Sequence, residues 1–138
     1  MDWLPYALAS AVFAAMTAIL CKLGIAGIPS NLATAIRTVV ILLFAWAIVL
    51  ARGEHRTLAG VKSKAVFFLL LSGVTTGLSW LAYFRALQLA PATRVAPIDK
   101  LSLPLTIVFA TLLLHESVSL YSTVGVALMI AGAVLTLY

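Results

Sequence analysis

The chain has 138 residues, of which 64% are hydrophobic and 9% are charged, and its formal net charge is +5 at pH 7. A soluble domain has about half apolar and about one quarter charged residues, so this composition excludes an ordinary water-soluble fold. The basic residues are scattered near helix ends instead of lying on one face, which argues against nucleic-acid binding. We therefore expect an integral membrane protein whose function lies among its helices.

Five apolar segments follow one another, and each is long enough to cross a bilayer, since about 20 helical residues span about 30 Å of hydrocarbon. The helices are predicted at about residues 3–23, 32–51, 65–87, 95–114 and 120–138. Pro91 lies in the short link before the fourth segment and makes a continuous helix there unfavourable. We predict an all-α membrane protein with one transmembrane domain, residues 1–138.

The charges mark the orientation in the membrane only weakly. The one polar loop of any length, between the second and third helices, carries Arg52, Arg56, Lys62 and Lys64, and the positive-inside rule places it in the cytoplasm. The opposite side carries as many as five basic residues at or near helix ends: Lys22, Arg37, Arg85, Arg94 and Lys100. Either buried basic residues do not direct insertion, or the chain inserts both ways round.

Two of the helices carry polar or aromatic side chains at helical spacing, which predicts a lined cavity. Ser10 and Thr17 lie on one side of the first helix, and Trp80 and Tyr83 lie near the end of the third. The alternatives are that the hydroxyls bond carbonyls of their own helix and that the aromatic rings form an interfacial belt.

Small residues at regular spacing allow helix backbones to approach closely in lipid. Gly73 and Gly77 have the G-x-x-x-G spacing in the third helix, and Gly125 and Gly132 lie seven apart in the last one. Such residues serve either a dimer seam or packing within one chain. We choose Gly125 and Gly132 as the dimer seam.

Charged residues within the spans are the strongest local signal, because an unpaired charge at the bilayer centre costs at least about 2.5–3.5 kcal/mol. Arg37 lies in the second helix, and Asp99 and Lys100 lie in the fourth. We expect Arg37 and Asp99 to pair at a cavity, with snorkelling as the alternative for the two cations. Asp99 could bind a cation or cycle a proton. Pro104 leaves a carbonyl without its helical bond and offers a bend for gating.

No motif points to an enzyme, a metal site or a cofactor. Nucleophile elbows, phosphate-binding loops and dinucleotide fingerprints are absent from the sequence. His115 and Glu116 are adjacent, and adjacent residues on a helix do not share a face, so they predict a solvated helix end. The lone Cys21 cannot form an intrachain disulfide. We predict that the protein is not an enzyme and needs no cofactor.

Nearly the whole chain resembles the EamA group of the drug/metabolite transporter superfamily. The resemblance rests on the order and spacing of Tyr83, Ala86, Leu87, Pro91, Ala96, Pro97, Pro104, Glu116, Gly125 and Gly132, with Lys22 and Arg37 matching the first half. His115 stands where the family more usually has glycine. Typical members have ten helices in two inverted five-helix repeats, and this chain is similar to the short five-helix bacterial and archaeal branch.

The resemblance implies one repeat of a 5+5 inverted-repeat bundle, which two antiparallel copies would rebuild around a midplane cavity. We predict a homodimer that moves a metabolite, amino acid or drug across a prokaryotic inner membrane by alternating access, with lipids and the solute as partners. The predicted residues are Arg37, Asp99 and Lys100 for binding or coupling, Tyr83, Trp80, Ser10 and Thr17 as cavity contacts, Pro104 for gating, and Gly125 and Gly132 for dimer packing. Two alternatives remain: a lipid-linked sugar flippase subunit with a different partner chain, and a nontransporting membrane scaffold.

Overall fold

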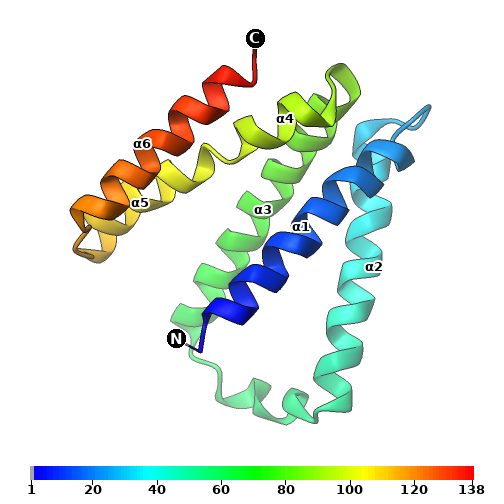
Figure 1. The fold of residues 1–138 in the computed structure, drawn as a ribbon. Helices are drawn as coiled ribbons and strands as arrows, with labels where there is room; N and C mark the ends of the chain where they lie inside the picture. The colour runs from blue at the N-terminus through cyan, green and yellow to red at the C-terminus, as the bar shows by residue number, and fades with distance from the viewer. Residues whose placement is uncertain (1) are drawn as a thin grey trace. The chain divides into compact units, whose positions relative to one another are not determined.

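The computed structural model describes residues 2–138, and every regular element in that range is a helix. The elements are α1 (Leu4–Gly24), α2 (Ser30–Ala51), the short 3-10 helix η1 (Glu54–Gly60), α3 (Ser63–Leu89), α4 (Ala92–Asp99), α5 (Ser102–Leu114) and α6 (Leu120–Leu135) (Figure 1). Four stretches have the length and apolar composition to cross a membrane, namely α1, α2, α3 and the pair α4 and α5 taken together, while α6 is a shorter apolar helix. The expected all-helical membrane protein is confirmed at this level.

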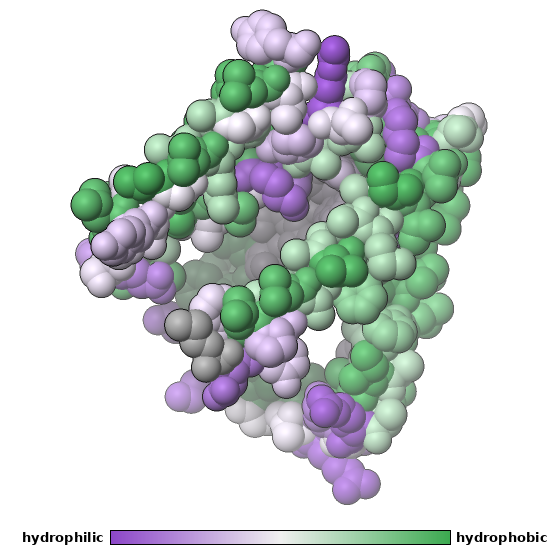
Figure 2. Space-filling view, viewed as in Figure 1, coloured by the Kyte–Doolittle hydropathy of each residue, from purple (hydrophilic) through white to green (hydrophobic). Residues whose placement is uncertain are grey.

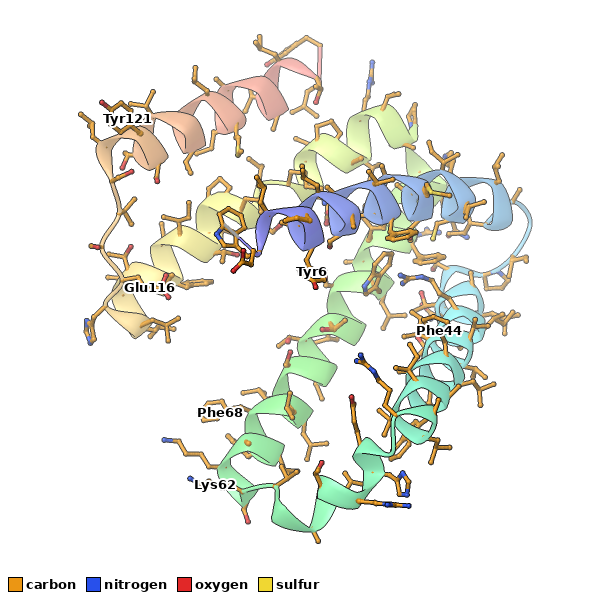
Figure 3. The ribbon with its side chains drawn as sticks, turned by 60° about the horizontal axis from the view of Figure 1, so that its bottom comes forward. Tyr6, Phe44, Lys62, Phe68, Glu116 and Tyr121 are labelled. Atoms are coloured by element: carbon orange, nitrogen blue, oxygen red, sulfur yellow. The ribbon has the colours of Figure 1, made fainter. Side chains whose placement is uncertain are left out.

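Large apolar side chains cover the outside of these helices instead of filling a core. Phe44 is 68% exposed, Phe68 56% and Tyr121 89%, and all three project from their helices in Figure 3. Hydrophobic residues also dominate the face drawn in Figure 2. Leaving one such side chain in water forgoes about 1.5–3 kcal/mol of burial energy, and dozens are exposed here, so hydrocarbon must be the solvent of this surface.

The chain divides into two compact units. We call Cys21–Gln88 the central unit, and Met1–Leu20 together with Leu89–Tyr138 the flanking unit. The boundary between the units cuts α1 near its end and α3 at its last turn. The two units are described separately below.

The core of the central unit lies where the end of α1, the start of α2 and the end of α3 meet. Leu87 is fully buried there and Phe84 is 3% exposed. Two side chains of the unit donate to backbone carbonyls of a neighbouring segment. The Lys22 ammonium donates to the carbonyl of Leu87, and Gln88 Nε2 donates to the carbonyl of Ile28 at 2.7 Å. The turn between α1 and α2 is therefore tied to the last residues of α3.

The fourth predicted helix is interrupted in the flanking unit, because α4 ends at Asp99 and α5 begins at Ser102. Pro104 has no N–H to donate to the carbonyl of Lys100. The N–H of Leu103 donates to that carbonyl instead, at 3.0 Å. The Lys100 carbonyl, which we expected to lack its helical bond, therefore accepts a hydrogen bond from the residue just before Pro104. The break in the helix places Asp99 and Lys100 at an irregular turn.

The turn from α5 to α6 is built around His115, whose φ of 55° lies in the left-handed region. The backbone N–H of His115 and that of Glu116 both donate to the carbonyl of Ala110, which closes the end of α5. Ser119 then caps α6 by accepting a hydrogen bond from the N–H of Ser122 at 3.1 Å. A glycine in place of His115 would adopt this conformation without strain.

We expect His115→Gly to stabilise the protein by about 1 kcal/mol, because a side chain in the left-handed region costs about that much. The melting temperature in detergent should rise by about 2–4 °C, measured by light scattering or intrinsic fluorescence. His115→Ala is the matched control, since it removes the imidazole but keeps the Cβ, and it should give no gain. An equal gain from both variants would mean that the imidazole, and not the backbone, is the source of the strain.

Candidate functional site

The end of α3 and the start of α2 bring a cation and aromatic rings together in the central unit. The guanidinium carbon of Arg37 lies 3.4 Å from the centroid of the Trp80 ring, which is a cation–π contact. Trp80 in turn meets Tyr83 edge-on, with ring centroids 5.5 Å apart, and Phe84 at 5.9 Å. Three of the predicted site residues, Arg37, Trp80 and Tyr83, therefore form one cluster, which we call the Arg37–Trp80 cluster.

Helical spacing explains the cluster. Trp80, Tyr83 and Phe84 are three and four residues apart, so they occupy one face of α3. Phe84 is almost fully buried and fixes that face against the core of the unit. On α2, Thr34 lies one turn before Arg37 and is also buried, with its hydroxyl donating to the carbonyl of Ser30 at 2.9 Å. The ring of Trp80 thus contacts Tyr83 and Phe84 on its own helix, and Arg37 of α2 lies on its face.

Arg37 and Trp80 both lie more than one turn inside their helices. Arg37 lies seven residues after the start of α2, or about 10 Å along it, and Trp80 lies nine residues before the end of α3, or about 14 Å. The bond from Gln88 to the carbonyl of Ile28 makes these two residues level. Arg37 lies nine residues from Ile28 and Trp80 eight residues from Gln88, so the two lie at similar depth. The guanidinium of Arg37 lies over the face of this ring.

The central unit contains one acidic residue, Glu54, and this residue does not neutralise Arg37. Glu54 lies in the loop after α2 and pairs with Arg52 at 3.6 Å, with both side chains largely exposed. The Lys22 ammonium donates to a backbone carbonyl, and Arg85 Nη1 donates to Gln88 Oε1 at 3.1 Å. Arg37 is therefore a cation at membrane depth for which the described residues of its own unit supply no carboxylate.

Asp99 and Lys100 lie in the flanking unit, at the break between α4 and α5. The Lys100 ammonium lies 3.4 Å from Asp99 Oδ2, and the two side chains are 56% and 37% exposed. A pair this open contributes little to stability, about 0–1 kcal/mol. It nevertheless places a carboxylate and an ammonium side by side on an irregular turn of a membrane span. Pairing of Asp99 with Arg37 stays a prediction.

The hydroxyl residues of α1 behave differently from one another. Thr17 donates its hydroxyl to the carbonyl of Phe13, four residues earlier, at 2.7 Å. Its proton is thus used within the helix, and only the lone pairs of its oxygen remain for a solute. Ser10 is exposed on the same helix, as is Tyr6, which projects from α1 in Figure 3. Both Ser10 and Thr17 remain predicted cavity contacts.

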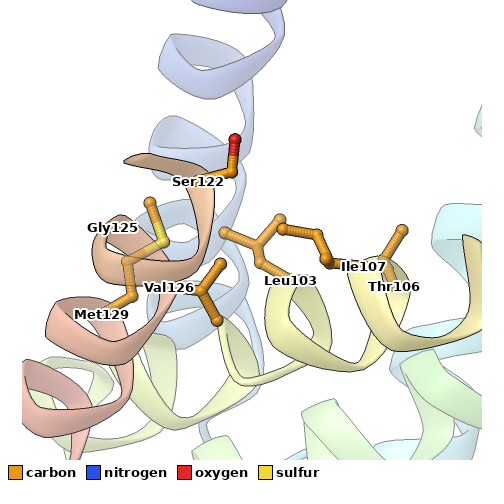
Figure 4. Close-up of a pocket in the computed structure, with 7 residues that line it drawn as sticks. All are labelled: Leu103, Thr106, Ile107, Ser122, Gly125, Val126 and Met129. Atoms are coloured by element: carbon orange, nitrogen blue, oxygen red, sulfur yellow. The ribbon is translucent and has the colours of Figure 1, made fainter. Parts of the chain in front are cut away.

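A groove of about 360 Å³ lies between α5 and α6, within the flanking unit. Figure 4 shows Leu103 and Ile107 of α5 facing Val126 and Met129 of α6, with Gly125 in the wall. A Cβ added to Gly125 would meet no atom within 4 Å, and the same holds for Gly132. Packing within the unit therefore does not require either glycine.

Sequence reasoning missed Gln88 as a structural residue, although its position was a signal. A polar amide in the last turn of an apolar helix is suited to bonding a free carbonyl of a neighbouring turn, and it does so here. From the sequence we also interpreted Lys22 as a basic residue at a helix end, whereas in the structure Lys22 links two segments of the central unit. Within residues 2–138, no group of three or more His, Cys, Asp or Glu side chains could hold a metal ion.

Comparison with known proteins identifies the family of this chain. The model of the EamA-like transporter family matches residues 1–138. A protein of Sinorhizobium sp, described as an uncharacterized transporter in the cobO 3' region, is 50% identical over 134 residues, which cover 97% of this chain and 95% of that protein. No solved structure matches the chain. The family resemblance is confirmed, and the chain belongs to the EamA-like transporter family.

Proposed function

We propose that this protein is a secondary transporter of the drug/metabolite type that moves a small solute across the inner membrane of a prokaryote by alternating access. Its family membership and a relative described as a transporter support this proposal. The observation that carries it is the Arg37–Trp80 cluster, because a structural helix gains nothing from a cation at that depth. The Asp99–Lys100 pair adds charges of both signs that a solute or a coupling proton could use.

The working unit is proposed to be an antiparallel homodimer that rebuilds a ten-helix bundle from two five-helix repeats. In this arrangement α6 is the fifth span, although its 16 residues cover only about 24 Å and need flanking residues or local thinning of the bilayer. The Sinorhizobium relative is matched over 95% of its length, so that protein has room for little more than one such repeat. The groove beside Gly125 and the near balance of basic residues support pairing of two copies in opposite orientations.

Flux into liposomes that contain only the purified protein tests the proposal. We expect uptake of at least one compound from a panel of labelled amino acids, small carboxylic acids and cationic dyes, driven by a solute or proton gradient. Protein-free liposomes are the control. Absence of uptake for the whole panel would favour the scaffold, and a second chain that copurifies at constant ratio would favour the hetero-oligomeric flippase subunit.

The orientation is tested with fusions to the C-terminus. A fluorescent protein that matures only in the cytoplasm and a phosphatase that is active only outside should both give signal if the chain inserts both ways round. Signal from one of the two reporters alone would contradict the antiparallel homodimer. Removing the positive charges of Lys62 and Lys64 should shift the ratio of the two signals, because loop charges direct insertion.

A further inference from the structure

The Arg37–Trp80 cluster has features that a purely structural arginine would lack. The guanidinium is half-buried at membrane depth, and the one acid of its unit, Glu54, is paired with Arg52 in the loop. The other two cations near the end of α3, Lys22 and Arg85, donate to a carbonyl and to a side-chain amide of the protein. Arg37 alone among these three cations has an aromatic face as its partner.

A guanidinium that stacks on an indole uses its flat face for the contact and not its N–H donors. The contact with Trp80 covers one face of the planar group, whereas its N–H donors lie in the plane of the guanidinium itself. Trp80 is fixed by Tyr83 and Phe84, so the orientation of the guanidinium is fixed as well. A planar fork of donors held in one orientation matches the two oxygens of a carboxylate.

We propose that the Arg37–Trp80 cluster is the subsite that binds a carboxylate group of the transported solute, so that the substrates are small carboxylic acids or amino acids. This inference rests on the proposed transport function and narrows its substrate class. The single positive charge of the guanidinium balances the single negative charge of a carboxylate. Its two N–H donors replace the hydrogen bonds that the carboxylate loses when it leaves water. Binding then supplies the charged partner that the described residues of the central unit do not give to Arg37.

The depth of the cluster favours a solute over a lipid headgroup. Lipid phosphates lie at the interface, whereas Trp80 lies about 14 Å along α3 from its interfacial end. A lipid phosphate would have to leave the headgroup region to reach the cluster.

The test compares acids with their amides, in which an uncharged group of similar size replaces the carboxylate that Arg37 would bind. Titration calorimetry on the detergent-purified protein would use leucine and leucinamide, phenylalanine and phenylalaninamide, and lactate and lactamide. In the unaltered protein, at least one acid should bind about 10- to 100-fold more tightly than its amide, as expected for a charge-assisted bidentate bond. If no acid binds more tightly than its amide, the proposal is overturned.

Variants then assign the preference to Arg37. Arg37→Gln should weaken acid binding about 10- to 100-fold and leave amide binding unchanged, and Arg37→Lys, which keeps the charge but loses the fork, should retain part of the preference. Arg85→Gln is the matched control, an exposed arginine on α3, and should keep the full preference. A preference that survives Arg37→Gln overturns the proposal. If Arg37→Gln does not fold, a preference for acids over amides that is undiminished in Arg37→Lys overturns the proposal.

Two further experiments distinguish a lipid-binding site, failure of the carboxylate subsite and failure of the transport function. Acid binding that is abolished by added phosphatidylglycerol would assign the guanidinium to a lipid phosphate and overturn the proposal. In liposomes, equal uptake of acids and amides leaves transport intact and refutes the carboxylate subsite. Acid preference in calorimetry without any uptake leaves the subsite intact and refutes transport by this protein alone.

Discussion

Asp99→Asn is expected to reduce solute uptake by about 100-fold and to remove its dependence on an imposed pH gradient. The loss of a charge interaction of about 2.5–3 kcal/mol at membrane depth corresponds to this factor. Asp99 is the one acid of the chain within a predicted span, since Asp2 precedes the first helix and Glu54 and Glu116 lie in loops. Asparagine keeps the size of the side chain but cannot take up or release a proton. Uptake by proteoliposomes with opposite pH gradients measures both effects.

Glu116→Gln is the matched control for this experiment, because Glu116 lies in the turn after α5 and is exposed. It should leave uptake within about twofold of the unaltered protein, as expected for a solvated surface charge. Unchanged uptake and pH dependence in Asp99→Asn would exclude Asp99 from coupling.

If the proposed homodimer packs through α6, Gly125→Leu is expected to convert it to a monomer, with at least a tenfold fall in the dimer fraction at fixed concentration. The groove beside Gly125 has about 360 Å³, so a leucine side chain fits within the unit, and a Cβ there meets no atom within 4 Å. The fold of the single chain should therefore survive. In a dimer the leucine would occupy the space that a helix of the partner copy needs. Light scattering in detergent and cross-linking in native membranes measure the change.

Gly73→Leu provides the comparison for this variant. A Cβ at Gly73 also meets no atom within 4 Å, so the substitution adds the same bulk to α3 without a clash in its own unit. If α6 forms the seam, Gly73→Leu keeps the dimer and Gly125→Leu loses it. The reverse result would move the seam to the G-x-x-x-G face of α3, and a dimer unaffected by both would remove the glycines from the interface.

Much of the architecture could be read from hydrophobicity. Apolar runs of about 20 residues leave no other stable arrangement in lipid, because every backbone N–H and C=O must be bonded within its own helix. The predicted second helix, residues 32–51, corresponds closely to α2, Ser30–Ala51. The predicted fourth helix, residues 95–114, is interrupted at Lys100. The sequence did not place this break, because the position of a proline kink depends on which neighbouring N–H bonds the freed carbonyl.

The sequence by itself determined that this chain lives in a membrane, that its charges in the spans are few, and that it belongs with the EamA-like transporters. These conclusions depend on composition and on spacing along one helix, which are local quantities. Only the tertiary structure decided which of the cations have protein partners. Lys22 bonds to a residue 65 positions away and Arg37 stacks on Trp80, and such contacts depend on how separate helices meet. Hydrophobic periodicity shows which residues leave water, but the choice of partner is made by packing.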